Sequence, residues 1–305
     1  MSWETALDRQ IHDYLPDLKW AADEPMAKHT SFRIGGPAKR MAFPKTREQL
    51  VVLMGFLQDA GVKPLLIGNG TNLLVADKGL DTVVIDTSAE LSHIELTDEG
   101  EIAADAGVSL AKLALFAWKN GLTGLEFAHG IPGTLGGGVV MNAGAYGGEL
   151  KDVVRGVLAI SPDGREERVF TNEEMQFGYR HSVLSDNGYI ALFASLQLAQ
   201  GDPAAIALTM RELNQKRNSK QPVQYPSAGS TFKRPEGHFA GKLIEDAGLK
   251  GVTVGGAQVS TLHSGFIINR SGATATDILQ LISLVQNTVY DRFGVMLEPE
   301  VRIIG

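Results

Sequence analysis

The 305-residue sequence contains no cysteine, and that absence excludes several classes of protein at once. A chain without thiols has no disulfide scaffold, no thiolate zinc site, no iron–sulfur cluster and no cysteine nucleophile. Basic side chains are also few relative to acidic ones, 28 against 35, which gives a formal net charge of −7. Because binding to a nucleic-acid backbone needs a basic surface, we expect no nucleic-acid partner.

The sequence also lacks a candidate membrane span and a recognisable export signal. The longest uncharged stretch, residues 130–148, carries eight glycines and an asparagine, so it predicts a loop rather than a lipid-spanning helix. Residues 1–5 include no basic segment followed by an apolar core. We therefore expect a soluble cytoplasmic protein without membrane insertion. The sequence does not indicate an oligomeric state, and we expect a monomer.

Several common cofactor and catalytic motifs are missing. Neither the dinucleotide fingerprint G-x-G-x-x-G nor the P-loop G-x-x-x-x-G-K-[ST] occurs, so a bound nucleotide would need a different arrangement of backbone amides. The motifs H-E-x-x-H and G-x-S-x-G are absent as well. The seven histidines show no metal-ligand spacing, so we expect no metal site.

Hydrophobic patterning predicts an α+β chain with segregated units and no internal repeat. Thr46 and Gln49 have the spacing of a capping box, and Asp202-Pro203 is another strong helix start. Apolar residues from Ile278 to Val289 form one stripe of a long helix. The expected helices cover residues 5–15, 46–60, 109–120, 202–218, 238–247 and 274–292. The expected strands cover 40–43, 63–67, 73–76, 82–86, 94–96, 101–103, 153–160, 166–170, 189–198, 230–233, 265–269 and 295–304.

Glycine is the one residue type in clear excess, at 35 of 305 residues against roughly 7% in average proteins. The glycines cluster in two loops, residues 68–72 after an apolar strand and residues 130–138 ahead of Asn142. Consecutive amides without Cβ atoms can form an anion-binding concavity, although a tight turn is the ordinary alternative for each loop alone. Two such loops on separate units favour an extended phosphate-bearing ligand.

Polar residues in the C-terminal half form a second candidate group. Tyr179 and Arg180 are adjacent, Ser230 lies in the run Ala-Gly-Ser-Thr-Phe, and Glu300 lies in the run Glu-Pro-Glu-Val. Each has an ordinary alternative when taken singly, namely a solvated arginine, a turn serine and a surface strand carboxylate. Their combination is what points to a site.

Five motifs in a fixed order carry a resemblance over nearly the whole chain, from His29 to the C-terminus. They are Ile67-Gly-Asn-Gly-Thr-Asn72, Gly130-Ile-Pro-Gly-Thr through Asn142-Ala-Gly-Ala-Tyr-Gly147, Tyr179-Arg180, Gly229-Ser-Thr-Phe232 and Glu298-Pro-Glu-Val301. Together they resemble the UDP-N-acetylenolpyruvoylglucosamine reductase (MurB) family, which belongs to a wider flavoprotein superfamily.

The resemblance implies an α+β, two-subdomain FAD-binding fold of the PCMH/vanillyl-alcohol-oxidase type, followed by a C-terminal α+β substrate domain. We expect residues 1–87 as the first FAD-binding subdomain, with 298–305 returning to it, 88–201 as the second, and 202–297 as the substrate domain. It also implies that FAD is held without a covalent bond by residues of the two glycine loops. These are Gly68, Asn69, Gly70, Thr71, Asn72, Gly130, Ile131, Pro132, Gly133, Thr134, Gly137, Asn142, Ala143 and Gly144.

The activity implied by the resemblance is the reduction of UDP-N-acetylglucosamine enolpyruvate to UDP-N-acetylmuramate for peptidoglycan, and hence for the bacterial cell wall. NADPH is the expected co-substrate and delivers hydride to FAD. Flavin N5 then delivers hydride to C3 of the enolpyruvyl group, and C2 is protonated.

The resemblance also assigns catalytic roles. Ser230 matches the family's proton donor to C2, with Lys233 or a water as a possible relay. Arg180 and Glu300 match positions around the substrate carboxylate, where the fixed charge of arginine favours the enolate. Glu300 must be protonated or share a proton there, because a bare carboxylate would repel the enolate. The expected substrate-binding residues are Tyr179, packed at the substrate, and the basic Arg217, Lys220 and Lys242, which would neutralise the diphosphate unless they are ordinary solvated side chains.

One departure and two alternatives remain. A longer branch of the family has an extra loop with a tyrosine that closes over substrate, and the 50 positions from Arg180 to Ser230 lack it. An FAD-dependent alcohol oxidase or dehydrogenase of the wider superfamily is one alternative, with His129 available for a histidyl link to flavin. A non-catalytic UDP-sugar sensor is the other, and the intact candidates at all three catalytic positions disfavour it.

Overall fold

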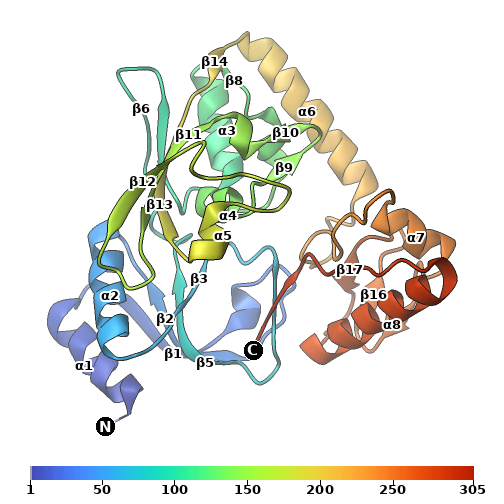
Figure 1. Cartoon of the computed structure of the whole chain (residues 1–305), viewed down its shortest axis with the longest axis horizontal. Helices are drawn as coiled ribbons and strands as arrows, with labels where there is room; N and C mark the ends of the chain where they lie inside the picture. Colours follow the sequence, from blue (N-terminus) through green and yellow to red (C-terminus); the bar gives the residue numbers. More distant parts are fainter. Residues whose placement is uncertain (1) are drawn as a thin grey trace. The chain divides into compact units, whose positions relative to one another are not determined.

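A computed structural model describes residues 2–305 and divides them into two compact units, each built from several chain segments (Figure 1). The first unit contains the segment that ends at Ala22 together with Arg40–Asn69 and Thr82–Gln215. The second contains Asp23–Lys39, Gly70–Asp81 and Lys216–Gly305. No helix in residues 2–305 combines the length and the apolar character needed to cross a bilayer.

The N-terminal sheet has the strand order β1-β2-β5-β3, and β3 runs parallel to β5. In the first unit, α1 and α2 lie side by side (blue in Figure 1) and bury apolar residues such as Leu7 and Leu53 with Val83 and Ile85 of β5. The elements up to residue 86 are α1 (Trp3–Tyr14), β1 (Lys19–Pro25), η1 (Met26–Lys28), β2 (Pro37–Phe43), α2 (Arg47–Asp59), β3 (Leu65–Ile67), β4 (Leu73–Val75) and β5 (Leu80–Asp86), of which η1 and β4 belong to the second unit.

A second, antiparallel sheet of the first unit has the order β12-β11-β13-β7-β6. The helices α3 and α4 share a hydrophobic core with it, which includes Leu113, Leu135 and Val157. The elements are β6 (Ile94–Leu96), β7 (Ile102–Asp105), α3 (Leu110–Lys119), β8 (Leu122–Thr123), η2 (Glu126–Gly130), α4 (Leu135–Val140), β9 (Gly144–Ala145), β10 (Gly148–Glu149), η3 (Leu150–Asp152), β11 (Val154–Ile160), β12 (Glu167–Thr171), α5 (Val183–Asn187), β13 (Ile190–Leu196), β14 (Ala199–Gln200) and α6 (Pro203–Lys220).

The second unit packs α8 against a three-stranded antiparallel sheet, β15-β16-β17. The apolar stripe of α8 expected from the sequence is confirmed, because Ile278, Leu281, Ile282, Val285 and Val289 are all buried. The C-terminal β18 pairs in parallel with β4. The remaining elements are α7 (Ala240–Asp246), β15 (Thr253–Val254), β16 (Ala257–Val259), β17 (Ile267–Asn269), α8 (Ala275–Phe293) and β18 (Arg302–Ile304).

The structure corrects the expectation that residues 130–148 form only a loop, because α4 lies inside the tract. This six-residue helix contains three glycines, which are poor helix formers. Tertiary packing explains two of the three, since an added Cβ would lie 2.8 Å from Ala106 Cβ at Gly136 and 2.8 Å from Leu150 Cδ1 at Gly138. A glycine-rich helix has little apolar periodicity, so patterning did not predict it.

Two other local expectations need correction. Thr46 begins α2 and accepts a hydrogen bond from the amide of Gln49, but the Gln49 side chain accepts from the Lys45 amide instead of completing a capping box. The expected strands at 230–233 and 295–304 reduce to an isolated bridge between Phe232 and Pro299 and the three residues of β18. Two backbone hydrogen bonds make this bridge, from the Lys233 amide to the Glu298 carbonyl (2.8 Å) and from the Glu300 amide to the Thr231 carbonyl (2.8 Å).

Asp77, in the connection between β4 and β5, forms hydrogen bonds with the N-terminus of α8. Its carboxylate accepts hydrogen bonds from the amides of Ala275 (2.7 Å) and Thr276 (3.0 Å) and from the Thr276 hydroxyl (2.8 Å). Burial acts to raise the pKa of Asp77, but these hydrogen bonds outweigh it and leave the pKa below its usual value. A negatively charged carboxylate at a helix N-terminus is also stabilised by the positive end of the helix dipole.

We expect Asp77→Ala to lower the free energy of unfolding by about 1–2 kcal/mol at pH 7, the usual cost of losing a helix cap. Because the native pKa is the lower one, this contribution is present above the unfolded-state value and is lost as the pH falls through the native pKa. Denaturant titrations at several acidic pH values measure both effects. Asp81→Ala, an exposed carboxylate nearby in the same unit, is the control and should change little. Equal losses for both variants would contradict the capping role.

Candidate active site

The two glycine loops expected to bind an anion come together in the first unit. An added Cβ on Gly68, which directly follows β3, would lie 2.2 Å from Oγ1 of Thr134, the residue that begins α4. Thr134 is buried, and its hydroxyl oxygen accepts a hydrogen bond from the Gly137 amide. Only glycine leaves room for this approach, so the two clusters meet where β3 ends and α4 begins.

Several amides in these loops have no acceptor within residues 2–305. They belong to Gly68–Thr71 and to Gly133–Thr134. The first two amides of α4 differ, because they donate hydrogen bonds of 2.7 and 2.8 Å to carbonyls of the segment that precedes α3. Unpaired loop amides of this kind suit the pyrophosphate of a dinucleotide, so the residues present fit FAD through the loops rather than through the helix terminus.

Asn142, expected to donate to a ligand, uses its side chain inside the protein. The carboxamide nitrogen donates to Glu149 Oε2 (2.9 Å) and to the Gly178 carbonyl (3.0 Å), and the oxygen accepts from the Lys151 amide (3.0 Å). The amide of the next residue, Ala143, donates to a carbonyl of α4. Contact of Asn142, Ala143 and Gly144 with the cofactor therefore stays a prediction.

Arg180 lies in a tight turn of the first unit. Gly178 and His181 bridge the turn with mutual backbone hydrogen bonds of 3.0 and 3.4 Å, which leaves Tyr179 and Arg180 at its tip. Arg180 has a φ of 54°, in the left-handed region that glycine usually occupies. Its guanidinium carbon lies 5.2 Å from the centroid of the exposed Tyr179 ring. An unfavourable backbone at a candidate catalytic residue is typical of functional sites.

The structure brings the Ser230 and Glu300 segments together in the second unit. The carbonyl of Thr231, next to Ser230, accepts a hydrogen bond from the Glu300 amide (2.8 Å). The Asn72 side chain donates to the Glu300 carbonyl (3.1 Å), so the first glycine loop holds this backbone directly. Lys233, the possible relay, forms an ion pair with Glu298.

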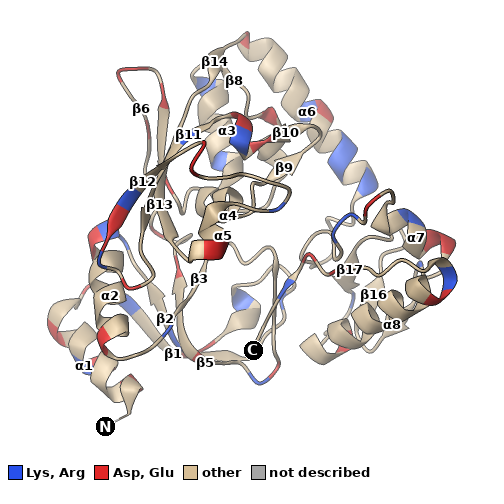
Figure 2. Cartoon of the chain, viewed as in Figure 1, with Lys and Arg blue, Asp and Glu red and all other residues tan. Residues whose placement is uncertain are grey.

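The expected diphosphate ligands lie on two helices. Arg217 and Lys220 are on the last turns of α6, where Figure 2 shows several basic segments. Lys242, on α7, forms an exposed i,i+4 ion pair with Asp246 at 2.6 Å, and the hydrogen bond that its ammonium donates to that carboxylate raises the pKa of Lys242. Such pairs are common on solvated helix surfaces. A substrate role for Arg217, Lys220 and Lys242 stays a prediction.

Patterning missed two polar residues, Ser182, which holds the Arg180 turn, and Glu149, which accepts a hydrogen bond from Asn142 (2.9 Å). Ser182 is buried and donates to the Val140 carbonyl (2.9 Å). One signal for Glu149 was present, since it is the first charge after the longest uncharged stretch. His129, considered for a flavin link, has its Nδ1 2.6 Å from the Asn214 amide nitrogen.

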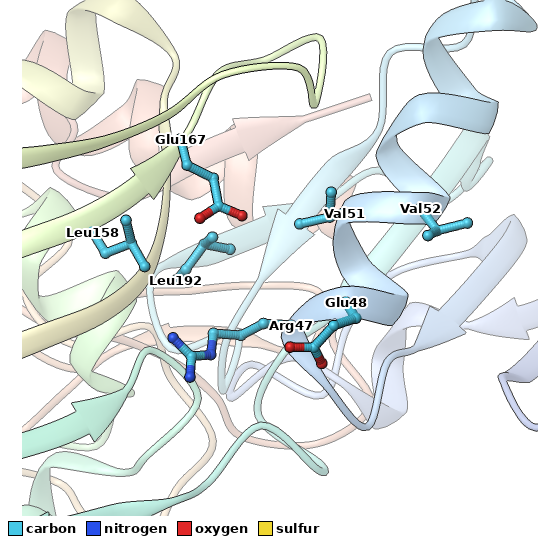
Figure 3. Close-up of a pocket in the computed structure, with 7 residues that line it drawn as sticks. All are labelled: Arg47, Glu48, Val51, Val52, Leu158, Glu167 and Leu192. Carbon is cyan, nitrogen blue, oxygen red and sulfur yellow. The ribbon is translucent and has the colours of Figure 1, made fainter.

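A hollow of about 320 Å³ in the first unit contains none of the predicted site residues (Figure 3). Side chains of α2 and of three strands of the second sheet line it. In the close-up, Arg47 and Glu48 extend from the start of α2, with Glu167 across from them. No cluster of histidine and acidic residues in the described part of the chain has the arrangement of a metal site.

Comparisons with known proteins identify the family of the chain. An FAD binding domain model matches residues 38–169, and a model described as the C-terminal domain of UDP-N-acetylenolpyruvoylglucosamine reductase matches residues 221–304. Proteins named UDP-N-acetylenolpyruvoylglucosamine reductase from Alkaliphilus oremlandii and Caldanaerobacter subterraneus are 52% and 49% identical to the chain. The matches cover 93% and 97% of the chain, and 92% and 97% of those proteins.

A solved structure of the same family is also similar to the chain. The crystal structure of UDP-N-acetylenolpyruvylglucosamine reductase (MurB) from Thermus caldophilus superposes with a TM-score of 0.81 at 35% identity, covering 94% of this chain and 99% of that one. Together with the two domain models, this confirms the expected fold class, an FAD-binding part followed by a C-terminal part.

Proposed function

The chain belongs to the UDP-N-acetylenolpyruvoylglucosamine reductase family of FAD-dependent oxidoreductases, and on this premise we propose that it reduces UDP-N-acetylglucosamine enolpyruvate to UDP-N-acetylmuramate with NADPH. The observation that carries the proposal is the pairing of the Ser230 and Glu300 segments through the Thr231 carbonyl and the Glu300 amide. These segments are 70 residues apart in the sequence, and the proposed reaction needs a proton donor and a carboxylate-binding group at one substrate.

FAD is the cofactor that the loops fit, held by the unpaired amides of Gly68–Thr71 and Gly133–Thr134. When bound, FAD supplies two-electron chemistry, taking hydride from NADPH and passing it to C3 of the enolpyruvyl group. The glycines of these loops have no Cβ atom and let the backbone approach the pyrophosphate closely, and the loops add no negative charge.

Ser230 and Arg180 would handle the charge and the proton at the substrate. Hydride addition at C3 leaves negative charge on C2, which delocalises into the adjacent carboxylate as an enolate. Arg180 stabilises this charge with a guanidinium that remains ionised, and the bond strengthens as the charge grows. The Ser230 hydroxyl then gives its proton to C2, and the serine regains a proton from water or Lys233.

Glu300 would assist as a hydrogen-bond donor. It serves the enolate only when it carries or shares a proton, since an ionised carboxylate would repel the developing charge. The Thr231 carbonyl and the Asn72 side chain both bond the backbone of Glu300, so its position is set from two directions. Tyr179 would pack on the substrate, and Arg217, Lys220 and Lys242 would neutralise the diphosphate.

We also propose the three functional divisions expected from the sequence, residues 1–87 and 88–201 for FAD and 202–297 for substrate. The parallel pairing of β18 with β4 supports the return of residues 298–305 to the first of these. Arg302 pairs with Leu73 and Ile304 with Val75, so the C-terminal strand lies beside the strand that follows the first glycine loop.

An anaerobic visible spectrum tests the function directly. We expect flavin absorbance in the purified or FAD-loaded protein, bleaching on addition of NADPH, and recovery on addition of UDP-N-acetylglucosamine enolpyruvate. Bleaching without recovery would rule out this substrate and leave a flavoenzyme of another specificity. A protein that takes up no FAD would contradict the proposal at its first step.

A further inference from the structure

The proposed reaction does not explain the left-handed backbone of Arg180 in its turn. A left-handed backbone is unfavourable for arginine, so contacts around the turn must impose the φ of 54°. Arginine occupies a position whose backbone suits glycine best, so other residues must hold the turn in this conformation.

The chain segment at the end of α4 holds the turn on both sides. Before the turn tip, the Asn142 side chain donates to the Gly178 carbonyl at 3.0 Å. After it, the Ser182 hydroxyl donates to the Val140 carbonyl at 2.9 Å. Two anchors two residues apart on one segment thus fix the backbone that enters and leaves the turn.

Asn142 is itself locked in one orientation. Its oxygen accepts from the Lys151 amide (3.0 Å), and its nitrogen donates to Gly178 and to Glu149 Oε2 (2.9 Å). Rotating the amide by 180° would place its oxygen against two other oxygens. The residue is 1% exposed and has a φ of 41°, a conformation that asparagine tolerates better than most residues.

Glu149 connects this anchor to the charge of Arg180. The Lys151 ammonium, 2.8 Å from Glu149 Oε2, holds the pKa of Glu149 below its usual value against the opposing effect of burial. The Asn142 amide and the positive charge of Arg180 lower it further. Glu149 is therefore ionised at neutral pH, and its charge attracts the guanidinium.

We infer that Asn142 and Glu149 are positioning residues for Arg180. Asn142 holds the backbone of the turn, and the Glu149 carboxylate holds the Asn142 amide by accepting its hydrogen bond (2.9 Å). The inference rests on the proposed function, in which Arg180 stabilises the enolate. It also gives the glycine tract a second role, since the segment expected to bind FAD continues directly into the residue that places a catalytic side chain.

A double-mutant cycle in the FAD-loaded protein tests the inference. Asn142→Asp keeps the shape and backbone preference but replaces the donating nitrogen with an oxygen, and we expect kcat to fall about 10–100-fold. Glu149→Gln removes only the charge and should lower kcat about 10-fold. If both act through Arg180, neither substitution should lower kcat further in an Arg180→Ala background. Effects that multiply with that of Arg180→Ala would overturn the inference.

Asn172→Asp is the matched control. The Asn172 side chain also donates to two carbonyls, those of Lys151 (2.9 Å) and Val154 (2.6 Å), but does not contact the turn. We expect kcat within about 2-fold of the parent. A loss equal to that of Asn142→Asp would mean that general packing explains both, and loss of bound FAD in Asn142→Asp at saturating FAD would assign Asn142 to cofactor binding instead.

Trypsin cleavage after Arg180 provides a readout that does not depend on the reaction. Loss of the Asn142 anchor should let the turn open more often, and we expect cleavage at this bond to be about 10-fold faster in Asn142→Asp and unchanged in Asn172→Asp. Equal rates in parent and Asn142→Asp would overturn the inference. If the parent protein does not turn over the substrate, the proposed function fails, and cleavage still decides whether Asn142 holds the turn.

Discussion

Replacing Ser230 with alanine should lower turnover of UDP-N-acetylglucosamine enolpyruvate by about 10²–10⁴-fold, the usual range for losing a general acid. Bleaching of the flavin by NADPH should survive, because that half-reaction needs no proton at substrate C2. Stopped-flow absorbance separates the two half-reactions in one sample. The Glu300–Thr231 hydrogen bond involves backbone atoms alone, so the pairing of the two segments should persist in the variant.

Ser227→Ala is the control for that experiment. Ser227 lies three residues before Ser230 in the same chain segment, and its side chain has no assigned role in the site. Its turnover should stay within about 2-fold of the parent. Normal turnover by Ser230→Ala would remove Ser230 as the proton donor, whereas loss of NADPH bleaching would show that Ser230 acts before the substrate is reduced.

Replacing Arg180 with glycine should change stability and activity in opposite directions. Glycine adopts the left-handed backbone at position 180 without strain, and relief of that strain should raise the free energy of unfolding by about 1 kcal/mol. The variant loses the guanidinium that stabilises the enolate, and turnover should fall about 10²–10³-fold, as when a group that binds developing charge is removed. Denaturant titration and steady-state kinetics measure the two effects.

Gln176→Gly is the matched control for the arginine. Gln176 is exposed, has a φ of 48°, and lies four residues before Arg180 in the same unit. Its replacement should give a similar gain in stability with unchanged turnover. If Arg180→Gly destabilised the protein while Gln176→Gly stabilised it, the side chain of Arg180 would be needed for folding. That result would contradict the expectation that Arg180 lowers stability through backbone strain.

Local structure was largely predictable where side chains alternate regularly between core and solvent. The stripe on α8, the start of α2 at Thr46 and the start of α3 at Ser109 all follow from residues within one or two helical turns. These features depend on spacings of three and four residues, which a sequence displays directly. The glycine-rich α4 was missed because glycine has no side chain from which a period can be recognised.

The candidate site was predictable as a set of residues but not as an arrangement. Ordered motifs singled out Arg180, Ser230 and Glu300, yet no pattern indicated that the Asn142 side chain bonds Gly178 or that Asn72 bonds the carbonyl of Glu300. Asparagine side chains donate and accept equally well toward solvent, ligand or backbone, so composition does not choose among these partners.

The sequence by itself determined the class of protein, the main helices, the two glycine loops and the residues on which the proposed chemistry depends. Only the tertiary structure decided which side chains hold distant segments together through hydrogen bonds. Asp77 caps a helix almost 200 positions away, and Asn72 reaches a carbonyl 228 positions away. Contacts between segments so distant in sequence form only when the whole chain packs, because no local propensity encodes their partners.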